Sequence, residues 1–241
     1  MNQKNKTTAS ATRPIFIPND KEIGVLEKNI TFDWHMGMTA AVRKRSIVSL
    51  HQKAAEQGFN NILEASSKSE QAIGIRLSAF FLKDGNGIPV ENLFQSSKIF
   101  QHGGPFLDLK SATVMPKNAK RDDRLRTSGE MTAFRFNNQD FPLEPKSLFY
   151  DWLYIKILFG TNNADLKDNF LSCHFDAFSD IEFNPKKSFS CQARTLALAV
   201  SLHQNESIKD FIRDPVKVAR QFNLYGKVSY QSNSPIQNNL F

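Results

Sequence analysis

The chain has 241 residues, of which 31 are Lys or Arg and 24 are Asp or Glu, so its formal net charge at pH 7 is +7. With 40% hydrophobic and 23% charged residues, the composition is that of a globular protein and excludes wholesale disorder and collagen-like repeats. The longest apolar runs, at 153–159 and 196–202, are too short to cross a bilayer, so no membrane partner is expected. Two cysteines without CxxC spacing and the lack of a secretory leader predict a cytoplasmic protein.

No Gly/Ser or Pro linker and no internal repeat divides the chain, so a single domain is predicted over residues 15–230. Residues 1–14 are polar and basic and are predicted to form a flexible leader. Residues 231–241, rich in Gln, Asn and Ser, are predicted to form a flexible tail.

The secondary structure is predicted from periodicity and from turn residues. Extended segments are expected at 15–18 and 25–34, and a helix at 38–57. Strands are expected at 61–65 and 74–82, where the turn Asp84–Gly87 predicts a hairpin that returns at 88–90. Further helices are expected at 91–100, 145–159, 164–173, 188–203 and 214–222. Because helices outnumber strands and the strands cluster early, the fold is predicted to be α+β, helix-rich with a small hairpin or sheet.

A carboxylate and an amine are spaced for one face of the helix predicted at 91–100. At about 100° per residue, Glu91, Gln95 and Lys98 fall within an arc of about 60°. The Glu91 and Lys98 backbones would lie about 10 Å apart, leaving a gap that a sugar or base could bridge. Such a pair suits acid/base and nucleophilic chemistry. The alternative interpretation is an ordinary solvated helix face.

Other patterns favour some kinds of functional site and exclude others. Asp180, Glu182 and Asn184 alternate, so they would share one side of an extended segment and could bind a metal or ribose hydroxyls, or simply form a turn. The five histidines show no HxxH or HExxH pairing, and the GxGxxG, GxxxxGK[ST] and GxSxG motifs are missing, so no metal or cofactor is expected. The basic runs 43–45 and 117–126 favour either an anionic partner or a solvated surface.

Several blocks resemble, in order and spacing, the NADAR (YbiA-like) family of N-glycosidases. They are Leu77–Phe80, Val90–Phe100, Tyr150–Trp152 and Phe175–Asp180. A second set resembles the branch found as an antitoxin beside guanine-specific DarT-type DNA ADP-ribosyltransferases, namely Ser66–Ser69, Gly103–Phe106, Pro142–Lys146 and Glu182–Ser188. The resemblance covers about residues 13–205. Ala79 stands where the family usually has Asn.

The resemblance implies a NADAR-like domain that removes ADP-ribose from guanine bases of DNA by cleaving the bond between ribose C1 and the base. ADP-ribosylated DNA would be the substrate, ADP-ribose a product and a DarT-type toxin the functional partner. By position, Glu91 matches the essential carboxylate, Lys98 the lysine that forms a Schiff base, and Asp180 the late acidic residue. The expected substrate-binding residues are Ser78, Phe80, Phe94, Gln95, Gly103, Gly104 and Trp152.

Two other functions remain open from the sequence. One is an N-glycosidase that acts on free phosphorylated ribosides. The other is a non-catalytic antitoxin that binds its toxin or shields the DNA.

Overall fold

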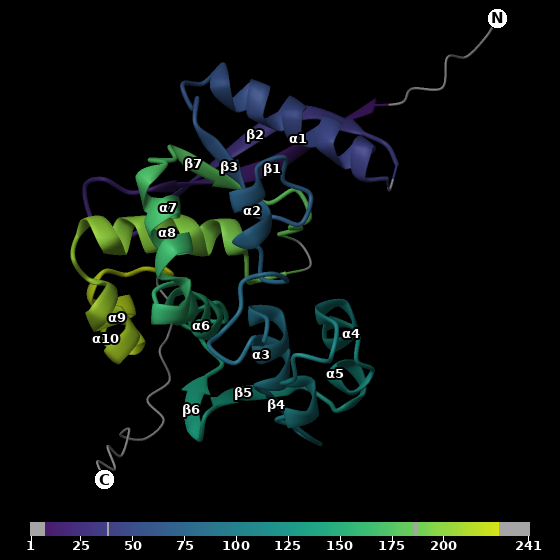
Figure 1. The fold of residues 1–241 in the computed structure, drawn as a ribbon, viewed down its shortest axis with the longest axis vertical. Helices are drawn as coiled ribbons and strands as arrows, with labels where there is room; N and C mark the ends of the chain where they lie inside the picture. Colours follow the sequence, from purple (N-terminus) through teal and green to yellow (C-terminus); the bar gives the residue numbers. More distant parts are fainter. Residues whose placement is uncertain (1–7, 38, 186–187, 227–241) are drawn as a thin grey trace, which may run out of the picture.

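The computed structural model describes residues 8–37, 39–185 and 188–226, and it has the predicted α+β class (Figure 1). The strands are β1 (Thr8–Pro18), β2 (Val25–His35), β3 (Ile62–Glu64), β4 (Lys98–Phe100), β5 (Met131–Phe136), β6 (Gln139–Pro142) and β7 (Ala177–Ser179). The α-helices are α1 (Ala40–Ala55), α2 (Ala72–Arg76), α3 (Val90–Ser96), α4 (Pro116–Lys120), α5 (Arg124–Thr127), α6 (Leu148–Leu158), α7 (Ala164–Ser172), α8 (Gln192–Gln204), α9 (Ile208–Arg213) and α10 (Pro215–Gln221). Short 3₁₀ turns lie at Leu107–Leu109 and Thr161–Asn163.

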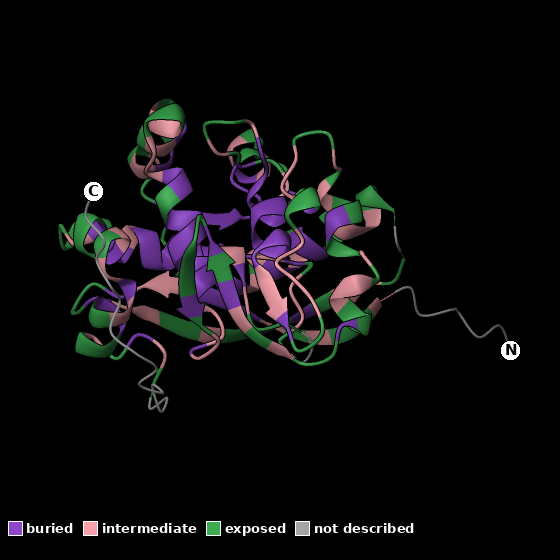
Figure 2. Ribbon diagram, turned by 90° about the horizontal axis from the view of Figure 1, so that it is seen from below, coloured by how far each residue is buried: buried purple, intermediate pink, exposed green. Residues whose placement is uncertain are grey.

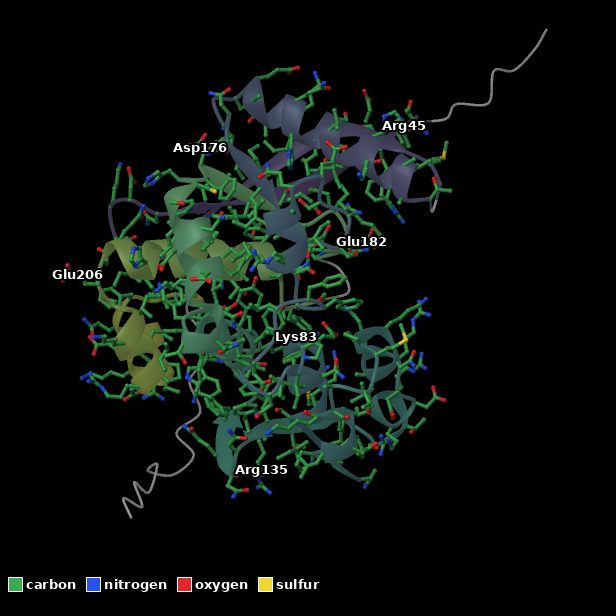
Figure 3. All side chains as sticks on the ribbon, viewed as in Figure 1. Arg45, Lys83, Arg135, Asp176, Glu182 and Glu206 are labelled. Atoms are coloured by element: carbon green, nitrogen blue, oxygen red, sulfur yellow. The ribbon has the colours of Figure 1, made fainter. Side chains whose placement is uncertain are left out.

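The larger sheet has the strand order β2-β1-β7-β3 and separates α1 from α8 (Figure 1). Successive side chains of a strand point to opposite faces. Accordingly, Ile15 and Ala177 pack in the core beneath α1, whereas Phe16 and Phe178, one residue further on, pack in the core that includes α8. Glu182, labelled in Figure 3, lies 3.5 Å from Arg43 of α1 and ties the segment after β7 to that helix.

Helix α6 is the centre of the larger core. Every residue of α6 except Lys156 is buried, and α3, α8 and α9 pack against the helix. A helix that buries residues on every side belongs in the interior of a protein. The buried interior therefore runs through the middle of the molecule, with exposed residues at its edges (Figure 2).

The smaller sheet, in the order β4-β5-β6, positions Lys98. In its antiparallel register Lys98 pairs with Phe134 of β5. Asn137 and Asn138 join β5 to β6 with positive φ angles of 48° and 62°, as a tight hairpin turn requires. The sequence interpretation did not predict β4, β5 or β6, and because β5, β6 and β7 follow residue 130, the expected early clustering of strands is wrong.

The predicted helix at 91–100 is too long, because α3 ends at Ser96 and Lys98 lies on β4. The hydroxyls of Ser96 and Ser97 both donate to the Leu93 carbonyl, at 3.1 and 2.7 Å, and so compete with continued helix. The Ser97 carbonyl then accepts the Arg135 N–H at 2.7 Å, so hydrogen bonding to the smaller sheet replaces the helical ladder.

The strand predicted at 74–82 is also wrong, because α2 and turns occupy this segment. A side chain at Gly74 would meet the Glu64 carbonyl at 2.2 Å, so the helix depends on glycine to approach β3 this closely. The turn at Asp84 does form, since the Asp84 carboxylate accepts the Asn86 and Ile88 amides. Its flanks meet only in the single bridge from Lys83 to Pro89, and Val90 already belongs to α3.

At the N-terminus, residues 8–14 belong to β1 rather than to a flexible leader, and Thr8 pairs with His35 of β2. Residues 1–7 and the predicted tail at 231–241 lie outside the described residues. None of the described helices is long and apolar enough to span a membrane.

Candidate active site

Glu91 is a buried carboxylate in the first turn of α3, with 5% of its surface exposed. Its backbone N–H donates to the Ala79 carbonyl at 2.9 Å. Its Oε1 accepts the side-chain amide of Gln95, one turn further along α3, at 2.8 Å. The Nζ of Lys120 on α4 lies 3.7 Å from the same oxygen. The carboxylate is thus oriented from two sides.

Lys98 approaches Glu91 from β4. Its Nζ lies 4.7 Å from the centre of the Phe94 ring, which α3 contributes one turn after Glu91. Phe94 is itself fixed by stacking on Phe134 and Phe149 and by an edge contact with Tyr150. Burial lowers the pKa of the Lys98 amine to about 8, and the charge of Glu91 partly opposes that shift.

Asp180, directly after β7, is a second buried carboxyl group. Burial raises its pKa to about 8, and the neighbouring carboxylate of Glu64 adds to the shift. Its Oδ1 accepts the Glu182 amide at 3.0 Å, and its Oδ2 accepts the side-chain amide of Gln192 at 3.0 Å. At neutral pH Asp180 is therefore mostly protonated and carries a proton that it can donate.

Gln192 links the two carboxyl groups through the backbone. Its Oε1 accepts the Ala79 N–H at 2.7 Å while its Nε2 donates to Asp180. The Ala79 carbonyl in turn accepts the Glu91 N–H. Ala79 thus connects both acids through its own peptide groups.

Tyr150 of α6 is within electrostatic reach of both Glu91 and Asp180. Burial raises the pKa of its hydroxyl well above the usual value, and the charges of Glu91 and Asp180 both contribute. A tyrosine in this position stays neutral and keeps its proton. It therefore adds a polar but uncharged wall next to Phe94.

The glycines expected to bind substrate shape the backbone beside Lys98. Gly104 has a φ of +87°, and a Cβ there would lie 2.3 Å from the Lys98 carbonyl. The Gly103 carbonyl accepts the Phe100 N–H at 2.8 Å. The 101–104 turn consequently folds against β4 and fixes the strand that carries Lys98.

Comparison with known families gives one decisive match. The model of the DarT1-associated NADAR antitoxin family matches residues 11–232. The chain belongs to this family. A comparison with curated proteins finds no match. The matched range includes every candidate site residue, and it supports the role of a DarT-associated antitoxin.

In this antitoxin, two of the expected substrate-binding residues are engaged within the protein. The Ser78 hydroxyl is buried and donates to the Ile75 carbonyl at 2.8 Å. Trp152 is 2% exposed, and its indole N–H donates to the Ile212 carbonyl at 2.9 Å. The indole ring packs on the aromatic rings of Phe136, Phe141 and Phe149. Ser78 and Trp152 therefore support the site from within the core.

The structure thus brings together Glu91, Phe94, Gln95 and Lys98, and it connects Asp180 to Glu91 through Gln192 and Ala79. Phe80 borders this group, since the Lys120 Nζ lies 5.7 Å from its ring centre. Sequence interpretation gave no individual role to Lys120, Gln192 or Glu64. Lys120 lies in the basic run 117–126, which favours an anionic partner or a solvated surface. Nothing in the spacing of Glu64 or Gln192 distinguishes them from other polar residues.

Behind Asp180, a polar network faces α1. The Ser179 hydroxyl donates to Glu64 at 2.5 Å, and His51 of α1 lies 2.8 Å from the same hydroxyl. Burial raises the pKa of Glu64 and lowers that of His51 to about 4. A cavity of about 220 Å³ reaches both side chains from the α1 face. Among the described residues, no three His, Cys, Asp or Glu side chains are grouped to hold a metal ion.

Proposed function

We propose that this antitoxin is a DNA ADP-ribosyl glycohydrolase that removes ADP-ribose from guanine bases modified by a DarT-type toxin. The observation that carries the proposal is the partly buried Lys98 amine, whose pKa is lowered to about 8, next to Glu91. At neutral pH a useful fraction of such an amine is unprotonated and nucleophilic. A solvated lysine, with a pKa near 10.4, would be almost entirely protonated.

The chemistry begins with attack by the Lys98 amine on ribose C1. The nitrogen lone pair forms a C–N bond as the bond from C1 to the guanine nitrogen breaks, and the departing electron pair stays on the base. Opening of the ribose ring then gives a Schiff base between Lys98 and C1. Addition of water releases ADP-ribose and restores the free amine, so one water is consumed for each adduct removed.

The acids have separate roles in this scheme. Asp180, protonated at neutral pH, supplies the proton that the departing guanine needs. Glu91 orients the ribose hydroxyls and the attacking water. The Oε1 atom of Gln95 is buried and accepts no hydrogen bond from the described residues, so a ribose hydroxyl would satisfy it.

The test uses purified protein and an oligonucleotide that carries ADP-ribose on guanine. Wild type is expected to release free ADP-ribose and unmodified DNA. Glu91→Gln and Lys98→Ala are expected to lose at least about 100-fold in rate, within the range usual for such groups. Glu130→Gln, at an exposed position directly before β5, serves as the matched control and keeps the wild-type rate.

Trapping the intermediate tests the covalent step. Cyanoborohydride reduces the Schiff base, so mass spectrometry of the digested wild-type protein is expected to find the ADP-ribosyl mass on the peptide containing Lys98. No adduct on that peptide, with release intact, would remove Lys98 as the nucleophile. An untouched oligonucleotide would favour a small phosphorylated riboside as substrate, and protection of cells by Glu91→Gln would favour a binding antitoxin.

A further inference from the structure

Within the basic run 117–126, the ion pair of Lys120 is directed into the site, whereas the ion pairs of Arg124 and Arg126 lie at the surface. Arg124 pairs with Asp108 and Asp122, and Arg126 pairs with Asp123, all outside the site. The Lys120 ammonium instead lies 3.7 Å from the Glu91 carboxylate. The Lys120 side chain reaches Glu91 from the surface, since 59% of the Lys120 side chain is exposed, whereas only 6% of the Glu91 side chain is.

The position of α4, which ends at Lys120, is fixed by a residue next to Glu91. Asn92 is fully buried on α3, and its side-chain amide donates to the carbonyls of Leu109, Ser111 and Val114 at 3.1, 3.3 and 2.8 Å. These carbonyls lie in the segment that leads into α4 (Figure 1). Helix α3, which carries Glu91, therefore also fixes the segment that leads into α4 and positions Lys120.

The charges around Lys98 come from a small set of groups. Glu91 on α3 and Lys120 on α4 act on its ammonium with opposite signs, and Lys120 also acts on Asp180. Tyr150 on α6, which packs against the same Phe94 ring, is neutral because burial raises its pKa. The only like charge that these groups bring to Lys98 is thus the ammonium of Lys120.

We propose that Lys120 is a positioning residue, which pairs with the Glu91 carboxylate from the surface side and, by offsetting the negative charge of that carboxylate, favours the neutral, nucleophilic form of the Lys98 amine. The expected effect of Lys120 on the reaction rate rests on the proposed function. The charge effect on Lys98 does not depend on any substrate. Its consequence for the rate follows only if Lys98 is the nucleophile.

The first test measures Lys98 without substrate. Competitive labelling with acetic anhydride across a pH series, read by mass spectrometry, gives the pKa of each reactive lysine. Lys120→Gln is expected to raise the Lys98 pKa by about half a unit or more, because a neighbouring cation disfavours protonation. Lys120→Arg, which keeps the charge, is expected to restore the wild-type value, and Lys209→Gln on α9 is the surface control.

The second test measures release from the ADP-ribosylated oligonucleotide. At pH 7 a half-unit rise in the Lys98 pKa corresponds to about a threefold lower rate in Lys120→Gln, with recovery at higher pH. An unchanged Lys98 pKa in Lys120→Gln, or a shift that Lys120→Arg fails to reverse, would overturn the proposal. If wild type releases nothing while the labelling shift is present, the proposed function fails and the positioning role stands.

Discussion

Lys98 and Glu91 lie on different elements, a strand and a helix, yet the charge of Glu91 acts directly on the Lys98 amine. Helix α3 ends at Ser96, and the strand that follows places the Lys98 amine over the Phe94 ring, one turn from Glu91. Tertiary structure, and not helical spacing, thus brings the Lys98 amine within electrostatic reach of the Glu91 carboxylate. A continuous helix would have held them apart along its axis.

Activity is expected to peak near pH 8. Lys98 must lose its proton to attack, so the rate rises with pH up to its pKa of about 8. Asp180 must keep its proton to donate it, so the rate falls above its pKa of about 8. Single-turnover release between pH 5.5 and 10 measures both limbs. A rate still rising at pH 9.5 would contradict the role of Asp180, and Asp180→Asn is expected to lose the alkaline limb.

His51 is expected to make stability depend on pH between about 4 and 6.5. Its folded pKa of about 4 is below the unfolded value of 6.5, so it contributes stability above pH 6.5 that is lost as the pH falls through 4. In urea unfolding, the free energy of unfolding of wild type, relative to that of His51→Gln, should rise by about 3 kcal/mol between pH 4 and pH 7. The non-titrating neighbour control Gln52→Ala should show no such gain, and equal pH slopes in wild type and His51→Gln would refute the assignment.

Asp151, which precedes the core tryptophan, is expected to be a large contributor to stability. Its buried carboxylate accepts hydrogen bonds from Arg194 at 2.8 Å, Thr195 at 2.5 Å and Tyr225 at 2.8 Å. Asp151→Ala leaves the Arg194 charge uncompensated and should cost about 3–5 kcal/mol of unfolding free energy. Asp210→Ala, in an exposed ion pair with Arg213, is the control and should change stability little. A small loss for Asp151→Ala in urea unfolding would contradict this account.

Two exposed cations in and directly after α4, Lys117 and Arg121, are expected to bind the DNA part of the substrate. Lys117→Gln and Arg121→Gln should each lower the slope of log affinity against log salt by about one, as a lost phosphate contact does. Fluorescence anisotropy with a labelled ADP-ribosylated oligonucleotide measures this slope. Arg213→Gln is the control, because it lies on α9, which Figure 1 shows well apart from α4. If all three variants share the wild-type slope, a small riboside becomes the better substrate candidate.

Much of the site could be predicted from the sequence because its motifs are local. The pairing of Glu91 with Gln95 needs only helical spacing, and the structure contains it. The placement of Lys98 on a helix was wrong because Ser96, Ser97 and Arg135 determine where α3 ends, and their hydrogen bonds depend on the smaller sheet. Because the smaller sheet was not predicted from the sequence, the end of α3 could not be predicted either.

The contributions of Gln192 and Glu64 could not be predicted for a related reason. Gln192 meets Ala79 across 113 positions of sequence, and Glu64 meets Ser179 across 115. Side chains this far apart show no spacing pattern in a single sequence. Similarly, the strand predicted at 74–82 is replaced by α2 and turns, and the close approach of Gly74 in α2 to Glu64 of β3 is a contact that the local sequence does not reveal.

The link from Ala79 through Gln192 to Asp180 also bears on when an antitoxin becomes effective during its synthesis. Gln192 begins α8, so a growing chain that ends before this residue contains Glu91 and Lys98 but cannot connect Ala79 to Asp180. Contacts of such long sequence separation form only after most of the chain is available. A ribosome that stalls after Lys98 but before Gln192 would therefore yield a chain with the proposed nucleophile but without the hydrogen bonds that hold Asp180, and protection would lag behind translation.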